Sequence, residues 1–300
     1  MTFWLGTFAD AITAVAVLAL VSVGLYITYG VLRVINLAHG DMMTLGAYIT
    51  VFACRSGLPF ALAVAVATLT VGLLGLVVEA TIIRPLHSRD DLSTLLATWG
   101  LGLVITEAIR IFVGPSGEYV DLPTTTVVHL WSVPYPLYSV YLVALSVLIL
   151  AGLGYCLTST RAGLVVRAVI ENPTLAALRG FRVTLVRGIA FGIGAGLTGL
   201  AGAVVGPISA ITPTMGVEFA MLAFMVAIIA GPPQPAAARA RGRIYIGLAV
   251  LLPCVAAATL VGGSRSILSS LLGVTTATFG MLAITIAMLL SRPNGILGTR

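Results

Sequence analysis

Long apolar runs, separated by short polar or Gly/Pro-rich intervals, cover most of the chain. They lie at about 10–31, 36–53, 60–83, 92–113, 136–158, 184–207, 217–231, 244–262 and 267–290. A membrane-spanning helix needs about 20 apolar residues, so the pattern predicts eight or nine spans. The seventh run is short and the second is rich in glycine. Either could be a broken or re-entrant helix, which is tolerated where protein covers it.

The composition agrees with a chain that has the bilayer as its solvent. Hydrophobic residues make up 59% of the 300 residues and charged residues 9%, against about 25% charged in ordinary soluble domains. We therefore expect an all-α, polytopic transmembrane helical bundle that forms one integral-membrane domain over residues 1–300. Nine spans leave no room for a fused ATPase, a large receptor domain or a catalytic head outside the membrane.

The arginines predict an orientation. All 16 basic residues are arginine, and cytoplasmic loops of membrane proteins collect Lys and Arg. The interval 159–187 is the richest in arginine, which places it in the cytoplasm, the N-terminus outside and the C-terminus inside. Only Arg55, Arg110 and Arg265 then lie outside. The arginines are scattered between apolar runs, a pattern that does not predict nucleic-acid binding.

Common catalytic, metal-binding and cofactor motifs are missing from the sequence. Cys54, Cys156 and Cys254 lie far apart, each in or beside an apolar run, so we expect apolar packing and neither a metal site nor a disulfide framework. No phosphate loop, zinc signature or nucleophile elbow occurs. We expect no cofactor, and any active transport must draw on a partner or an ion gradient. No basic residue precedes the first apolar run, which argues against a cleavable signal peptide.

Glycine recurs along the sixth run at close to helical spacing. Gly188, Gly192, Gly196 and Gly199 form a stripe of small residues, which lets two helix backbones approach closely inside a membrane. The stripe predicts helix packing. A smooth face that slides during transport would use the same residues.

A polar segment interrupts the first two runs. It contains Asn36, His39 and Asp41, and polar groups near membrane depth are costly and are often functional. His39 and Asp41 are two residues apart and do not share a helix face. One interpretation is a structural turn, with Asn36 or Asp41 capping the second helix and a tight bend at Gly40. The other is that these residues line a translocation path.

Two carboxylates inside the apolar runs have nearby arginines. Glu79 lies one turn from Arg84, and Glu107 precedes Arg110 by three residues. Both arrangements predict ion pairs, and a proton relay would need acidic groups that are deeper and more numerous.

The arginine-rich interval contains a short predicted helix. Asn172 followed by Pro173 is a helix start, and Gly180 a stop. Leu175 and Leu178, with Phe181 at looser spacing, would form an apolar edge. Such an edge either docks onto a partner or lies in the lipid headgroups. We favour docking.

Several stretches in order along the chain carry a resemblance to a known family. They are 29–48, Glu79 with 84–86, Arg167-Ala168 with 171–173 and Gly180, the Gly-rich sixth run ending at Gly206-Pro207, and the closing 292–298. The chain resembles the LivH-type permease subunits of branched-chain amino acid ABC transporters. The resemblance implies a multi-pass subunit of the bacterial-type plasma (inner) membrane that imports branched-chain or other hydrophobic amino acids.

The same resemblance implies the partners. These would be a sister permease, two cytoplasmic ABC ATPases that hydrolyse ATP, and an extracytoplasmic substrate-binding protein, with membrane lipid around the complex. It also implies that the cytoplasmic segment of about 160–187 contains the helix that couples to the ATPase. The coupling residues would be Arg167, Glu171, Asn172, Pro173, Leu175, Leu178 and Gly180.

The chain departs from the family pattern after the sixth run. The family has a lysine-containing apolar run and a Gly-rich loop, whereas 219–231 here has no lysine and 232–243 is rich in Pro, Ala and Arg. The departure leaves the substrate open, with urea or short amides as alternatives for an ABC permease. An ion-coupled secondary carrier working alone and a membrane subunit without a conduction path are the rival classes.

Overall fold

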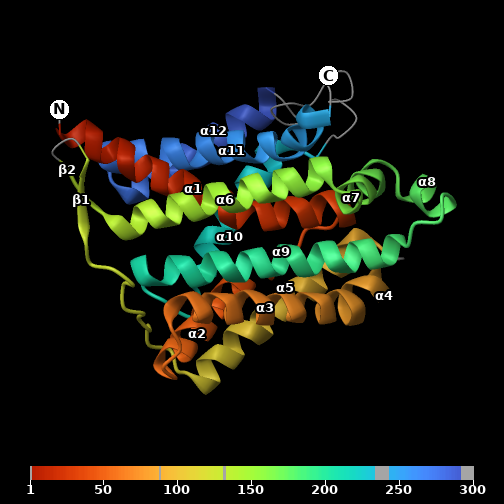
Figure 1. Cartoon of the computed structure of the whole chain (residues 1–300), viewed down its shortest axis with the longest axis horizontal. Coiled ribbons are helices and arrows are strands. Elements are labelled where there is room, and N and C mark those ends of the chain that lie inside the picture. The colour runs from red at the N-terminus through yellow and green to blue at the C-terminus, as the bar shows by residue number, and fades with distance from the viewer. Residues whose placement is uncertain (1, 88, 131–132, 234–242, 292–300) are drawn as a thin grey trace.

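The computed structural model describes residues 2–87, 89–130, 133–233 and 243–291, and it is an all-α bundle of membrane-spanning type (Figure 1). The predicted apolar runs are largely helical, although the ninth run, 267–290, is divided between two helices. The helices are α1 (Thr2–Leu32), α2 (His39–Arg55), α3 (Phe60–Val78), α4 (Arg84–Leu86), α5 (Asp91–Phe112), α6 (Leu137–Ser159), α7 (Arg161–Glu171), α8 (Pro173–Leu178), α9 (Val183–Val205), α10 (Met215–Ala230), α11 (Arg243–Leu272) and α12 (Val274–Ser291). A π-helical turn, Glu79–Ile83, joins α3 to α4, and a 3-10 turn, Gly206–Ile208, follows α9.

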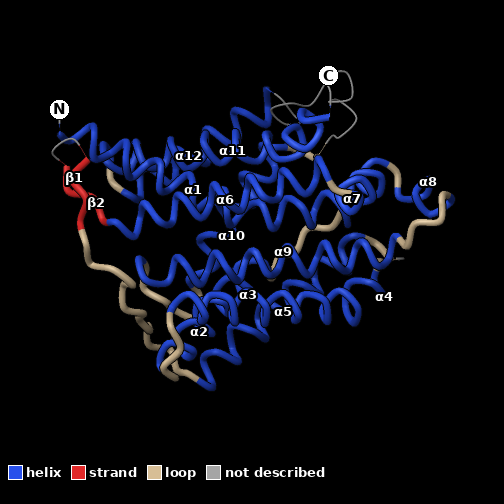
Figure 2. Tube along the Cα trace, in the orientation of Figure 1, coloured by secondary structure: helices blue, strands red, loops and turns tan. Residues whose placement is uncertain are grey.

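The bundle has two distinct ends, which Figure 2 separates clearly. At one end, strands β1 (Val127–Leu130) and β2 (Val133–Pro136) pair as an antiparallel hairpin. At the other end, α7 and α8 project from the helices. We call these the hairpin end and the α8 end. The hairpin was not predicted from the sequence, although valine, which favours strands, occurs in both of its strands.

Helix α9 is the centre of the bundle and packs against α1, α2 and α3. Its small residues allow this on two faces. Toward α3, Gly199 meets Val71. Toward α1, Gly194 packs directly against Gly24. Toward α2, a Cβ at Gly202 would collide with the carbonyl oxygen of Met43. Close backbone approach, which lipid-embedded interfaces favour, is therefore built into two sides of one helix.

Helix α2 begins deep in the bundle. The ring Nε2 of His39, its first residue, lies 3.0 Å from the carbonyl oxygen of Val21 in α1. Val21 lies eleven residues before the end of α1 at Leu32, or about 16 Å at the helical rise of 1.5 Å per residue. The segment 33–38 therefore returns into the bundle without helical structure, and α2 runs outward from there to the hairpin end.

Helix α10 meets the start of α2. Thr44 of α2 accepts a hydrogen bond of 3.0 Å from the backbone N–H of Gly216, and a Cβ at Gly216 would collide with the Gly40 carbonyl oxygen. At 16 residues α10 is a shorter apolar helix, about 24 Å long against a hydrocarbon core of about 30 Å. The described chain has seven helices long and apolar enough to span a membrane. The second and seventh apolar runs, whose spanning character was doubtful from the sequence, correspond to α2 and α10, and neither helix is among these seven.

The boundary expected between the eighth and ninth runs was placed too early. The pair Gly262-Gly263 lies inside α11, which continues to Leu272, and the chain turns at Gly273 with φ 85°. Gly262 packs against the backbone of Val15 in α1, where a Cβ would stand 3.1 Å from the Val15 Cα. Gly262 therefore serves helix contact and not a turn, whereas nothing lies within 4 Å of a Cβ added at Gly263.

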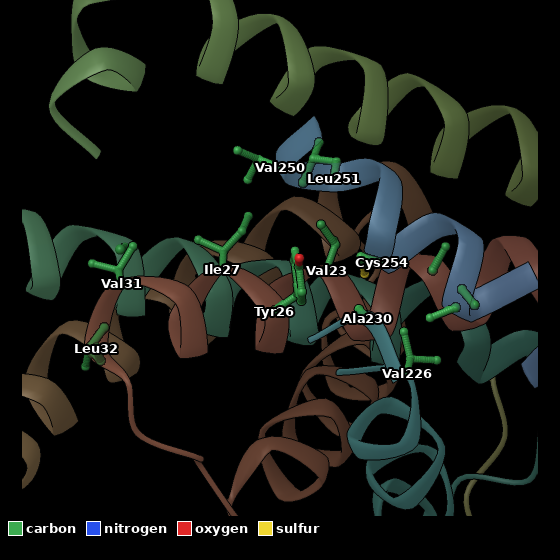
Figure 3. Close-up of a cluster of buried hydrophobic side chains, with 14 of the residues drawn as sticks. Val23, Tyr26, Ile27, Val31, Leu32, Val226, Ala230, Val250, Leu251 and Cys254 are labelled. Carbon is green, nitrogen blue, oxygen red and sulfur yellow. The ribbon is translucent and has the colours of Figure 1, made fainter. Parts of the chain in front are cut away.

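The apolar core on the α11 side contains unpartnered hydroxyl groups. Tyr26 of α1 lies among Val23, Leu251 and Cys254 with no exposed surface (Figure 3). Its hydroxyl and that of Ser22, one turn earlier, are buried with no hydrogen-bond partner among the described residues. A buried polar group without a partner costs about 1–3 kcal/mol, so this seam between α1 and α11 is not packed for stability alone.

The packing of α9 predicts the effect of adding one methyl group. Gly202→Ala should destabilise the protein by about 1–3 kcal/mol, as overpacked sites do, because the methyl meets the Met43 carbonyl oxygen. Gly100→Ala in α5, where nothing lies within 4 Å of the added atom, should be stabilising by up to about 1 kcal/mol. Thermal unfolding in detergent measures both. Equal melting temperatures for the two variants would contradict this packing.

Candidate functional site

The coupling segment predicted at 160–187 forms two short helices at the α8 end. The Asn172 Oδ1 accepts a hydrogen bond of 2.9 Å from the Leu175 N–H, which caps α8, and Pro173 is the first residue of the helix. Gly180 follows with φ 87°, a conformation that favours glycine. The predicted start and stop signals are confirmed.

Helix α8 presents an apolar side chain to its surroundings. Leu178 is 80% exposed and Leu175 47%, while Ala176 between them is buried. The backbone N–H of Phe181 donates to the Ala176 carbonyl at 3.2 Å, which folds the following chain back against the helix. Figure 1 shows α8 at the far end of the molecule, beyond α7, and its buried Ala176 belongs to the hydrophobic core. The helix is therefore ordered by its own caps and leaves its leucines uncovered.

Helix α7 anchors this projection to the bundle. Val169 and Ile170 are buried in the core, and Arg33, which follows α1, donates from Nη2 to the Ile170 carbonyl at 3.3 Å. Arg167 bends back to the Gly163 carbonyl, with its Nε at 3.3 Å. Glu171 is exposed. Among the predicted coupling residues, Arg167 therefore lies along α7. The exposed apolar surface of the coupling segment belongs mainly to α8.

His39 links three helices. Besides its contact with the Val21 carbonyl of α1, its Nδ1 lies 3.2 Å from the Thr198 hydroxyl of α9. The side chain is only 2% exposed. Both ring nitrogens thus have protein partners, and the position supports the structural interpretation of this residue.

Asn36 stabilises the non-helical segment 33–38 before α2 through a side-chain hydrogen bond. Its Oδ1 accepts from the Ala38 N–H at 3.1 Å, and the Leu37 N–H donates to the Thr98 hydroxyl of α5 at 3.2 Å. Backbone polar groups at membrane depth need such partners. Two details differ from the expectation. Ala38, and neither Asn36 nor Asp41, occupies the N-cap position of α2. Gly40 lies within the helix and forms no bend; its missing side chain allows the close contact with Gly216.

Asp41 points to α5. Its Oδ1 accepts a hydrogen bond of 2.7 Å from the Thr106 hydroxyl, and its Oδ2 lies against Gly102. The residue is half-buried, unlike Asn36 and His39. The expectation that His39 and Asp41 face different ways is confirmed. Asp41 is the member of the polar segment that keeps some open surface.

Both predicted ion pairs form. Arg84 Nη2 lies 2.7 Å from Oε2 of the buried Glu79, and Arg110 Nη1 lies 3.0 Å from Oε1 of the exposed Glu107. Of the three cysteines, all free thiols, Cys254 is buried, Cys54 is half-buried and Cys156 is exposed.

The predicted glycine stripe lies against α3 and the turn that follows it. Gly192 meets Leu76, Gly196 lies near the Thr68 carbonyl, and Gly199 meets Val71. Gly188 packs against the ion pair, where a Cβ would stand 3.0 Å from the Glu79 Oε2.

Sequence reasoning missed the threonines that complete the polar segment. Hydroxyls of Thr44, Thr98, Thr106 and Thr198, from α2, α5 and α9, bond to the segment or to the start of α10 beside it. The signal was available, because each is a polar residue inside an apolar run. Spacing within a run could not show that they converge.

Comparison with known proteins identifies the family. Residues 7–291 match the family described as the permease component of branched-chain amino acid transport systems. The chain belongs to this permease family. It is 24% identical over 323 residues to the high-affinity branched-chain amino acid transport system permease protein LivH of Escherichia coli K12, covering 99% of this chain and 96% of that protein.

Two further relatives give the same result. The LivH protein of Salmonella typhimurium is 23% identical with the same coverage, and the BraD permease of Pseudomonas aeruginosa is 24% identical over 98% of this chain and 96% of its own length. No solved structure matches. The chain is thus a multi-pass membrane transport subunit. The divergent loop 231–243 and the closing 292–298 stretch fall largely outside the described residues.

The position of His39 predicts a structural phenotype. His39→Leu should lower the free energy of unfolding by about 1–3 kcal/mol, since hydrogen bonds to α1 and α9 are lost in a buried site. His129→Leu on the exposed face of β1 is the matched control and should change stability by less than about 0.5 kcal/mol. Thermal unfolding of the purified chain compares them. A His39 variant of unchanged stability would favour a path-lining role instead.

Proposed function

We propose that this chain is the membrane-spanning subunit of an ATP-driven importer for branched-chain or other hydrophobic amino acids, with its α8 end in the cytoplasm of a bacterial-type cell. The carrying observation is α8, a capped helix that projects from the bundle with Leu178 uncovered. Leu175 and Leu178 together leave an apolar edge uncovered on a helix that is not one of the membrane-spanning helices, and an uncovered apolar patch marks an interaction site. The arginines of 159–187 support the orientation.

The proposed partners are a sister permease, two ABC ATPases and an extracytoplasmic binding protein. The sequence has no phosphate loop, so ATP hydrolysis requires another chain. The relatives named above support an amino acid as the solute, because their names assign them to branched-chain amino acid transport. A binding protein that delivers the solute would remove the need for a high-affinity pocket in the permease.

The connection from α8 to α9 suggests how a push is transmitted. Only residues 179–182 separate α8 from α9, and α9 is packed on α1, α2 and α3. Movement of a docked α8 would therefore shift the start of α9 along its glycine-lined contact with α3. Packed helices that have two arrangements convert such small shifts into larger changes.

We place the solute path beside Asp41. A half-buried carboxylate at membrane depth is costly and is usually functional, and a transported amino acid carries an ammonium group that it can meet. Asn36 and His39 would then hold the polar segment beside the path and not contact the solute.

The docking role of α8 is tested by one substitution. Leu178→Asp should abolish co-purification with the ATPase subunits and ATP-dependent uptake, because a charge replaces the apolar contact. The fold should be unchanged, since Leu178 is exposed. Leu122→Asp, at an exposed leucine in the loop at the hairpin end, is the control and should keep both properties. ATPase association that survives Leu178→Asp and deletion of 172–180 would refute the coupling assignment.

Uptake measurements in vesicles also distinguish this proposal from an ion-coupled secondary carrier. An ion-coupled carrier would take up solute in vesicles without the ATPases and would stop when the proton or sodium gradient is collapsed. We expect uptake that requires ATP and continues after the gradient is removed.

The path assignment predicts a different phenotype at Asp41. Asp41→Asn should reduce uptake of a hydrophobic amino acid about tenfold or more, because it removes the charge offered to the ammonium group, while ATPase co-purification stays intact. The amide can still accept the hydrogen bond from Thr106, so the contact between α2 and α5 should persist. Glu107→Gln provides the control, because it removes the charge of an exposed acid on α5 and should leave uptake unchanged. Normal uptake by the Asp41 variant would exclude it from the path.

A further inference from the structure

A cavity at the α8 end contains two arginines and belongs to none of the sites above. It has a volume of about 250 Å³ and lies between the end of α1, the π-helical turn with α4, and the first turns of α9. Arg84, His87, Thr184 and Arg187 supply its polar lining together with Glu79. Liquid water takes about 30 Å³ per molecule, so the cavity has room for a group of several heavy atoms such as a phosphate.

The charges in this cavity do not balance. Arg84 is paired with the buried Glu79 carboxylate at 2.7 Å. Arg187 faces the same carboxylate, but among the described residues it has no hydrogen bond or ion pair of its own, and its Nε is buried without a partner. With His87 neutral, two guanidinium groups and one carboxylate leave one positive charge. Planar guanidinium groups bind phosphate with paired donors, so a singly charged phosphate diester complements the cavity.

A separate apolar groove lies along the contact between α3 and α9, one helical turn from the cavity on α3. Its volume is about 360 Å³, and Leu73, Leu76, Ile189 and Gly192 are among its lining residues. Leu76 lies three residues before Glu79 on the same helix face, and it meets Gly192 of α9. The leucines and Ile189 are exposed, and the glycines of α9 keep the groove floor low. A charged cavity at the end of a membrane-facing apolar groove matches the two parts of a lipid.

We propose that this composite site binds one anionic phospholipid. Its phosphate diester would occupy the cavity against Arg187 and Arg84, and one acyl chain would lie in the groove between α3 and α9. Basic pockets between membrane helices bind anionic headgroups in this way. Lipid tails are as apolar as the groove, so the chain gives little preference over bulk lipid. The headgroup charge therefore sets the selectivity, and Arg187 is the main determinant.

The test is a lipid titration of the purified full-length chain in detergent, read by native mass spectrometry. Phosphatidylglycerol and phosphatidylcholine with identical acyl chains are compared at 0.15 M salt. We expect preferential retention of phosphatidylglycerol, and a loss of about tenfold in its affinity for Arg187→Gln, which corresponds to one charge-assisted hydrogen bond at about 1.4 kcal/mol. Arg182→Gln, which removes the same charge from an exposed position just before α9, should change the affinity less than twofold.

Two further arms keep the result decisive. Arg187→Lys retains the charge and should lose less affinity than Arg187→Gln, which separates recognition from misfolding. Leu73→Trp should block the groove and weaken phosphatidylglycerol binding several-fold, whereas Leu103→Trp on exposed α5 should not. Equal binding of the two lipids, or equal losses at Arg182 and Arg187, would overturn the proposal. Glycerol phosphate binding as tightly as the lipid would show an anion pocket without a lipid chain and would also overturn it.

Discussion

The close approach of helix backbones around α9 is the constraint on which the rest of the structure depends. In a bilayer, apolar side chains gain little by leaving lipid for protein, so helices associate through tight packing and hydrogen bonds. Gly199 provides the approach to α3, and Gly194 and Gly202 provide it to α1 and α2. One helix can contact three neighbours at short distance because two of its faces have no side chains to hold them apart.

The central position of α9 explains why the polar segment can exist. Residues 33–38 leave backbone groups at membrane depth, and these groups need partners that lipid cannot supply. Thr98 and Asn36 provide them, and His39 fixes the start of α2 to α1 and α9. The broken geometry of α2 and α10 is thus stabilised by hydrogen bonds from neighbouring helices, and it places Asp41 where a solute passing through the membrane could meet a charge.

The α8 end combines two kinds of recognition on adjacent surfaces. Helix α8 is held by backbone caps and offers exposed leucines, as suits a protein partner in water. The cavity beside Arg187 is half enclosed by helices and offers charge, as suits an anion at the membrane surface. Because α9 begins between these two surfaces, a lipid held at Arg187 would act on the same helix movement that we propose for the coupling segment.

Local patterns determined much of this protein from the sequence alone: the apolar runs, the caps of α8 at Asn172 and Gly180, and the short-range pairs Glu79–Arg84 and Glu107–Arg110. These depend on residues close together in the chain, where periodicity and spacing set the geometry. Gly40 gave a turn signal that the structure resolved as a helix contact, and the end expected for the eighth run at residue 262 lies inside α11, where Gly262 packs against α1. The convergence of four threonines on the polar segment, and of Arg187 and Arg84 on one cavity, joins residues far apart in sequence. Only tertiary packing decides such contacts, because a small or polar residue in an apolar run does not specify which helix will face it.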